Sequence, residues 1–105
     1  MTAPTTDLDL LIERYIAQWH ESDGLARRRC IEDIWTPDGT NFTKSFEVRG
    51  HHALEERVRA TYEKWVRDGG CVFRPRHADR HHGAVRFVWD MASRSDGKVI
   101  SVGVE

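Results

Sequence analysis

The first apolar residues of the chain recur every three or four positions, the spacing that places side chains on one face of an α-helix. They are Leu8, Leu11, Ile12, Tyr15, Ile16 and Trp19. Thr6 or Asp7 can cap the free N–H groups of the first turn. The pattern therefore predicts an amphipathic helix with one buried stripe.

Two more amphipathic helices are predicted downstream. Ser22-Asp23-Gly24 separates the first helix from a second one, which Pro37-Asp38-Gly39 terminates. A third helix runs from about His51 to Arg67, and Asp68-Gly69-Gly70 ends it. The predicted buried sides are Ala26, Cys30, Ile31, Ile34 and Trp35 in the second helix, and Leu54, Val58, Thr61, Tyr62, Trp65 and Val66 in the third.

The remaining segments have the alternation and composition of β-strands. One strand is predicted from Thr40 to Val48, with Phe42, Phe46 and Val48 among polar neighbours. Three more run over residues 71–79, 84–92 and 98–105, with turns at His81-His82-Gly83 and Ser95-Asp96-Gly97. The order α-α-β-α-β-β-β predicts a single α+β domain over residues 1–105.

Strand alternation also predicts which side chains share a face of the sheet, because successive side chains point to opposite sides. Val85, Phe87, Trp89 and Met91 form an apolar set that we expect to face inward, whereas Arg86, Val88 and Asp90 face outward. The same parity places further residues on the inner face: Phe73, Pro75, His77 and Asp79 on one strand, and Ile100, Val102 and Val104 on the last strand.

Composition and charge exclude several classes of protein. A net charge of −1 and a pI near 6.6 argue against a nucleic-acid or anionic-membrane partner, which needs a concentrated basic face. The basic run Arg27-Arg28-Arg29 is interpreted as a solvated helix face. The N-terminus lacks the features of a secretory signal and no apolar run could span a bilayer, so a cytoplasmic location is expected.

The two cysteines, Cys30 and Cys71, fit neither a CxxC redox motif nor a zinc knuckle, and free thiols are expected. A metal site built from His77, Asp79, His81 and His82 is disfavoured, since residues four apart on a strand lie about 13 Å apart. No metal and no cofactor are therefore predicted.

Several segments together carry a resemblance to a known family. They are the first helix with Tyr15, Trp35-Thr36-Pro37-Asp38-Gly39 at the end of the second, Arg49-Gly50-His51 at the start of the third, and the strand Arg86-Phe87-Val88-Trp89-Asp90. The chain resembles the nuclear-transport-factor-2-like superfamily, in the style of its SnoaL-like polyketide cyclase and ketosteroid isomerase branches. This resemblance implies a cone-shaped domain in which three helices cover a curved, mainly antiparallel sheet around a pocket.

The resemblance also implies a small, mostly hydrophobic ligand. Combined with the strand parity, it predicts Tyr15, His77 and Asp79 as candidate catalytic residues, since a His and a carboxylate can share a proton. The predicted ligand-lining residues are Trp19, Trp35, Phe42, Val58, Tyr62, Phe87, Trp89 and Val104.

The ketosteroid isomerase mechanism itself is not expected. In that branch a carboxylate base follows the first strand and a second acid lies on a later strand; these positions fall near Thr43 and Val104. Threonine cannot act as a carboxylate base, and valine cannot donate a hydrogen bond. Two interpretations stay open: a cofactor-independent cyclase, isomerase or hydrolase, and a non-catalytic ligand-binding or accessory protein.

The last expectation concerns assembly. The alternating segment Val99-Ile100-Ser101-Val102-Gly103-Val104-Glu105 ends without a turn signal, whereas the resembled proteins continue beyond it, so the chain is expected to be incomplete at its C-terminus or to pair with a neighbour. A homodimer is expected through the sheet face that carries Arg86, Val88 and Asp90, because alternating opposite charges can pair across a two-fold axis.

Overall fold

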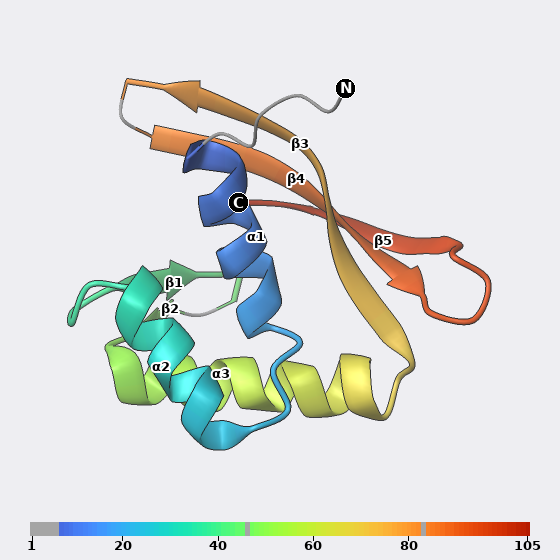
Figure 1. Cartoon of the computed structure of the whole chain (residues 1–105), viewed down its shortest axis with the longest axis horizontal. Helices are drawn as coiled ribbons and strands as arrows, with labels where there is room; N and C mark the ends of the chain where they lie inside the picture. Colours follow the sequence, from blue (N-terminus) through green and yellow to red (C-terminus); the bar gives the residue numbers. More distant parts are fainter. Residues whose placement is uncertain (1–6, 46, 83) are drawn as a thin grey trace. The chain divides into compact units, whose positions relative to one another are not determined.

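Helices occupy most of the first half of the chain and strands the second half (Figure 1). The structure is a computed structural model that describes residues 7–45, 47–82 and 84–105, and the side chain of His81 is not described. The expectations placed on Thr6, Phe46 and Gly83 lie outside the described residues. The chain divides into two compact units, Met1–Tyr62 and Glu63–Glu105, which we call the helical unit and the sheet unit.

The helical unit contains the three predicted helices. They are α1 (Asp7–Gln18), α2 (Gly24–Ile34) and α3 (His51–Thr61), and α2 packs against both α1 and α3. The apolar stripe of α1 is buried at Ile12 and Ile16, as its spacing predicted. The side chain of Asp23 caps α2 by accepting a hydrogen bond from the backbone N–H of Ala26, 2.9 Å away.

The basic run of α2 is only partly solvated, which corrects the sequence interpretation. Arg28 and Arg29 are exposed, but Arg27 is 3% exposed. Its Nη1 lies 3.2 Å from Oε1 of Glu55 on α3, and Nη2 donates to the backbone carbonyl of Glu21 at 2.8 Å. Its guanidinium also lies 5.5 Å from the ring centroid of Tyr62. A buried charge needs such compensation, so Arg27 links α2, its preceding loop and α3.

The segment between α2 and α3 is a hairpin, and the prediction of one strand from Thr40 to Val48 was wrong. Strand β1 (Thr40–Phe42) pairs antiparallel with β2 (Glu47–Arg49). The chain turns between them, where Thr43 Oγ1 accepts a hydrogen bond from the backbone N–H of Ser45. A hydroxyl bonded to the backbone two residues on favours a turn over an extended strand.

The third helix ends close to the predicted position. Directly after α3 comes a π-helix, η1 (Tyr62–Arg67), in which the backbone N–H of Asp68 bonds to the carbonyl of Glu63 at 3.0 Å. A Cβ at Gly69 would lie 2.8 Å from the carbonyl oxygens of Lys64 and Trp65, so only glycine fits this turn. Gly69 is therefore needed for a steric reason, whereas Gly70 has open space around it and a φ of 66°, which favours glycine.

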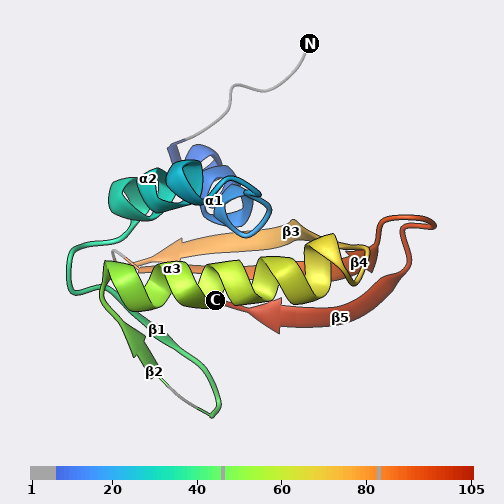
Figure 2. The same cartoon turned by 90° about the horizontal axis from the view of Figure 1, so that it is seen from below.

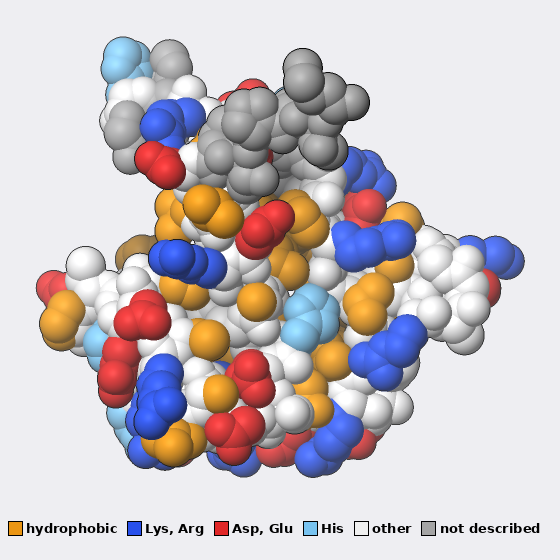
Figure 3. All heavy atoms as spheres, in the orientation of Figure 1, with side chains coloured by type: hydrophobic (Ala, Val, Ile, Leu, Met, Phe, Trp, Pro, Cys, Tyr) orange, Lys and Arg blue, Asp and Glu red, His pale blue; other side chains and the backbone are white. Residues whose placement is uncertain are grey.

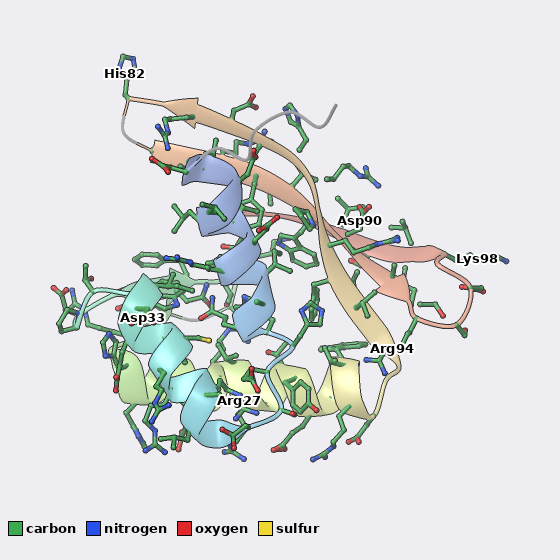
Figure 4. The ribbon with its side chains drawn as sticks, viewed as in Figure 1. Arg27, Asp33, His82, Asp90, Arg94 and Lys98 are labelled. Atoms are coloured by element: carbon green, nitrogen blue, oxygen red, sulfur yellow. The ribbon has the colours of Figure 1, made fainter. Side chains whose placement is uncertain are left out.

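The sheet unit contains three antiparallel strands in the order β3-β4-β5 (Figure 2). They are β3 (Cys71–His81), β4 (Ala84–Ser93) and β5 (Val99–Val104), and they match the predicted positions. His82 lies at the tip of the β3–β4 turn (Figure 4), and its φ is 48°. Gly97, in the β4–β5 turn, has a φ of 73°. Left-handed backbone is typical of tight hairpin turns.

A β-bulge in β3 changes which of its side chains share a face. Pro75 pairs with Trp89, but the next pair is His77 with Val88, so Arg76 is an extra residue on β3. Directly paired residues point to the same side of a sheet, and one inserted residue reverses the alternation beyond it. Odd-numbered residues of β3 therefore lie on one face before Arg76 and on the opposite face after it.

A second irregularity lies between β4 and β5. Met91 pairs with Ser101 and Ala92 with Val99, so Ile100 is the extra residue on β5. Val102 pairs with Asp90 and Val104 with Val88, on the face opposite Trp89. The prediction that Ile100, Val102 and Val104 form the inner face was wrong, and all three side chains are about half exposed.

Candidate functional site

Register divides the sheet unit into two chemically different faces. The aromatic face carries Phe73, Pro75, Phe87, Trp89, Met91 and Gly103. The charged face carries Arg74, His77, Asp79, Arg86, Val88, Asp90, Val102 and Val104. The β4 part of this division and the positions of Phe73 and Pro75 were predicted correctly. The bulge at Arg76 corrects His77 and Asp79, and the register between β4 and β5 corrects Val102 and Val104.

The aromatic face is centred on the Trp89 indole. Phe73 meets Trp89 edge to face, with ring centroids 5.5 Å apart and planes at 82°. On the other flank the indole covers Gly103, where an added Cβ would lie 2.0 Å from Cζ2 of Trp89. Phe87 and Met91 on the same face are buried, while Trp89 is half-buried. The face offers a large apolar surface with one indole N–H.

His77 and Asp79 form the predicted pair, but on the charged face. Nε2 of His77 lies 3.1 Å from Oδ2 of Asp79, and both side chains are more than half exposed. The bulge at Arg76 places them with Arg86 and Val88. The expectation that they share a face with Phe73 and Pro75 was therefore wrong.

Asp90 is the most enclosed acid of the charged face. Its side chain is 14% exposed, and Nη2 of Arg76 lies 2.8 Å from its Oδ1. The two groups form an ion pair without the alignment of a hydrogen bond. The extra residue of the β3 bulge is thus anchored to β4 by charge.

Sequence reasoning missed Glu105, which register places on the aromatic face. Its backbone N–H and carbonyl bond to the carbonyl and N–H of Phe87, at 2.9 and 3.0 Å. The two residues form a directly opposed pair and share a face. The family resemblance predicts the second acid position at Val104, one residue away. Only the register between β4 and β5 shows that Glu105, and not Val104, lies on the aromatic face.

The helical unit holds an aromatic cluster of Tyr15, Trp19 and Trp35. The Tyr15 ring centroid lies 6.2 Å from that of Trp19 and 5.9 Å from that of Trp35, and its hydroxyl oxygen is buried. Gln18, fully buried, accepts a hydrogen bond from Nε1 of Trp35 at 3.0 Å and donates to the Tyr15 carbonyl. The predicted residues Tyr15, Trp19 and Trp35 are therefore brought together.

A second polar group in the helical unit was also missed. Asn41 on β1 is 6% exposed, and its Oδ1 accepts a hydrogen bond from Nε of Arg57 on α3 at 2.9 Å. The Arg57 guanidinium lies 5.8 Å from the ring centroid of Trp19. The signal in the sequence was weak, because a polar residue beside Phe42 in a short strand normally faces solvent.

The other predicted ligand-lining residues have different environments. Val58 is 1% exposed, and the Tyr62 ring packs against the Arg27 guanidinium. Phe42 is 72% exposed, because the hairpin turns its side chain away from that of Asn41, and Val104 is 56% exposed on the charged face. The expectation that Phe42 and Val104 line an enclosed pocket was wrong for this structure.

Within the described residues, no group of three or more His, Cys, Asp and Glu side chains is arranged to hold a metal ion. None of the described helices combines the length and apolarity needed to cross a bilayer. On the side drawn in Figure 3, acidic and basic side chains are interspersed, with apolar side chains between them. These observations point to no particular function. The aromatic face, the charged face and the cluster of Tyr15, Trp19 and Trp35 are therefore the features on which a functional argument can be built.

The fold matches a crystal structure from Agrobacterium tumefaciens strain C58, a proposed isomerase of the SnoaL-like family. The TM-score is 0.78 at 23% sequence identity, over 90% of this chain and 79% of the other. No family model and no curated protein matches the sequence. The likeness shows that the chain has the nuclear-transport-factor-2-like fold of SnoaL-like proteins, an α+β fold of helices and an antiparallel sheet.

Proposed function

We propose that this chain is a cytoplasmic protein that binds a small, mostly apolar molecule on the aromatic face of its sheet. The observation that carries the proposal is the placement of Trp89 between Phe73 and Gly103. Among the described residues, none accepts a hydrogen bond from the Trp89 indole N–H. A half-buried aromatic surface with one available donor suits an apolar ligand that carries one acceptor. Two free thiols, Cys30 and Cys71, suit a reducing compartment.

Binding is tested with a neutral aromatic ketone, 2-acetylnaphthalene, titrated calorimetrically. Trp89→Ala removes the indole and should weaken binding about tenfold or more, since buried aromatic anchors dominate such contacts. The matched control is Trp65→Ala, because Trp65 is an exposed tryptophan of η1 whose ring packs on Lys64. The proposal would be overturned if both variants lost the same amount of affinity for 2-acetylnaphthalene, or if the unaltered protein did not bind it.

A second candidate function is cofactor-independent proton transfer, favoured by the carboxylate of Glu105 on the aromatic face and by the proposed isomerase that shares the fold. A carboxylate can take a proton from the carbon beside a carbonyl and return it, leaving an enolate in between. Within the helical unit, Tyr15 with its buried hydroxyl is a separate candidate donor to an oxyanion, and it is tested independently of Glu105. The alternative remains binding without chemistry.

One assay separates the catalytic and non-catalytic alternatives. In D2O, a proton-transfer enzyme exchanges the acetyl methyl protons of 2-acetylnaphthalene for deuterium, which NMR follows directly. Glu105→Gln should abolish most of the accelerated exchange while binding persists. If the protein binds the ketone but leaves the exchange rate at that of buffer, the non-catalytic interpretation holds.

We also propose a homodimer through the charged face. This face combines two apolar side chains that are about half exposed, Val102 and Val104, with opposite charges on directly opposed residues of β3 and β4, Asp79 and Arg86. A two-fold axis places a patch against its own copy, so interspersed opposite charges can pair across it. The apolar residues would supply the buried centre of such an interface.

A further inference from the structure

Asn41 has one half of its side-chain amide fixed by Arg57. Because arginine only donates hydrogen bonds, the atom that faces Nε of Arg57 at 2.9 Å must be the amide oxygen. The orientation of the amide group is therefore determined, and its nitrogen points away from Arg57. The side chain as a whole is more than nine-tenths buried.

The amide nitrogen of Asn41 has its hydrogens available for a ligand. Within the part of the chain that the structure describes, Nδ2 donates to no group. Solvent can still reach this nitrogen, because it is not one of the fully enclosed polar atoms without a partner. Because solvent reaches this nitrogen, it avoids the cost of about 1–3 kcal/mol that a sealed donor without a partner would carry, and a ligand oxygen can take the place of the water. A donor left open in a nearly buried side chain indicates a position where an acceptor arrives.

The surroundings of Asn41 favour a negatively charged acceptor. The Arg57 cation pulls electron density toward Oδ1 and so strengthens Nδ2 as a donor, an effect that grows in a low-dielectric site. Hydrogen bonds to ionised oxygens are roughly twice as strong as those between neutral groups. The Trp19 ring, against which the guanidinium packs, adds an apolar and aromatic wall.

We propose that Asn41, Arg57 and Trp19 form a carboxylate-recognition point in the helical unit. Nδ2 of Asn41 donates to a carboxylate oxygen of the ligand, the Arg57 cation lies behind the amide, and Trp19 contacts the apolar body. The ligand class is an aromatic or otherwise apolar carboxylate. This inference stands on residues separate from the aromatic face of the sheet.

The test uses 2-naphthoate and its neutral isostere 2-naphthamide. The unaltered protein should bind 2-naphthoate at least tenfold more tightly. In 15N-edited NMR spectra of that protein, the Asn41 side-chain NH2 signals should shift with 2-naphthoate, a measurement that needs no substitution. Asn41→Leu should weaken 2-naphthoate binding about tenfold or more, as expected for a hydrogen bond to a charged group. The control, Thr43→Val, also exchanges a polar for an apolar side chain in the same hairpin.

The inference is overturned if 2-naphthoate does not bind, if it binds no better than the amide, or if the Asn41 NH2 signals stay unmoved during binding. Equal 2-naphthoate affinity of Asn41→Leu and the unaltered protein would overturn it too. These failures are distinguishable from failure of the proposed function, which is judged with a neutral ketone and a substitution at Trp89.

Discussion

At the scale of single residues, the lack of a side chain at Gly103 leaves room for the indole of Trp89 on the sheet. Its backbone needs no left-handed conformation, so the requirement for glycine there is one of space. An added Cβ would lie 2.0 Å from Cζ2 and 2.2 Å from Cε2 of the indole. Those atoms belong to a rigid ring that Phe73 also contacts, so the ring cannot give way by a simple rotation.

Gly103→Ala should therefore destabilise the fold by about 1–3 kcal/mol, the usual cost of overpacking, measured by urea unfolding. Gly24→Ala is the matched control, because nothing lies within 4 Å of a Cβ at that helical position, and helix propensity favours alanine there. A double variant with Trp89→Ala should recover part of the loss. Full stability of Gly103→Ala alone would show that the indole moves freely.

The Tyr15 hydroxyl offers a second test at this scale. Tyr15→Phe keeps the ring that packs against Trp19 and Trp35 and removes one donor. If the protein accelerates deuterium exchange into 2-acetylnaphthalene, the rate should fall about 10²-fold, the usual effect of removing an oxyanion donor. An unchanged rate would remove Tyr15 from the catalytic candidates and leave it a packing role.

At the scale of elements, the ion pair of Arg27 and Glu55 joins α2 to α3 inside the helical unit. Both side chains are largely buried, so removal of the acid leaves an uncompensated charge. Glu55→Ala should lower the free energy of unfolding by about 3 kcal/mol. Glu56→Ala, at an exposed acid paired with exposed His52, should change it by less than about 1 kcal/mol. Thermal unfolding of both variants compares their stabilities. Similar losses of stability would contradict the role of the Arg27–Glu55 ion pair in joining α2 to α3.

The elements also show where sequence reasoning succeeds and fails. Helices were predictable because each buries one stripe at a regular spacing, as Ile12 and Ile16 do. The faces of β4 were also predictable, but those of β3 and β5 were not, because alternation carries no record of an extra residue or of the register between strands. The extra residue Arg76 misplaced His77 and Asp79, whereas Glu105 was missed because alternation does not tell which face of β4 it joins.

Asn41 was missed for a different reason. Its burial depends on Arg57, which lies 16 positions along the chain, and no local pattern reports a contact between a hairpin and a helix. Tyr15, Trp19 and Trp35 were found because their aromatic character and helical spacing agree with burial in the helical unit. Candidate sites were thus predictable where local pattern and packing coincide.

At the scale of the whole molecule, assembly depends on the charged face of the sheet. Val102→Glu places a charge among its apolar residues and should raise the dimer dissociation constant at least tenfold, because an unpaired charge in an interface is costly. The control is Leu25→Glu, at a comparably exposed apolar residue on α2. Light scattering at micromolar concentration measures both, and a monomeric unaltered protein would refute the dimer.

The bulge at Arg76 has a consequence for how this protein can change by descent. In most strands, loss of a single codon shifts the rest of the strand and is purged, since core residues turn toward solvent. Here, an in-frame deletion of codon 76 would leave Pro75 paired with Trp89 and His77 with Val88, so β3 would become regular while every other side chain keeps its face. Position 76 is thus a place in this strand where one residue can be lost without turning any other side chain to the opposite face, at the cost of the ion pair between Arg76 and Asp90.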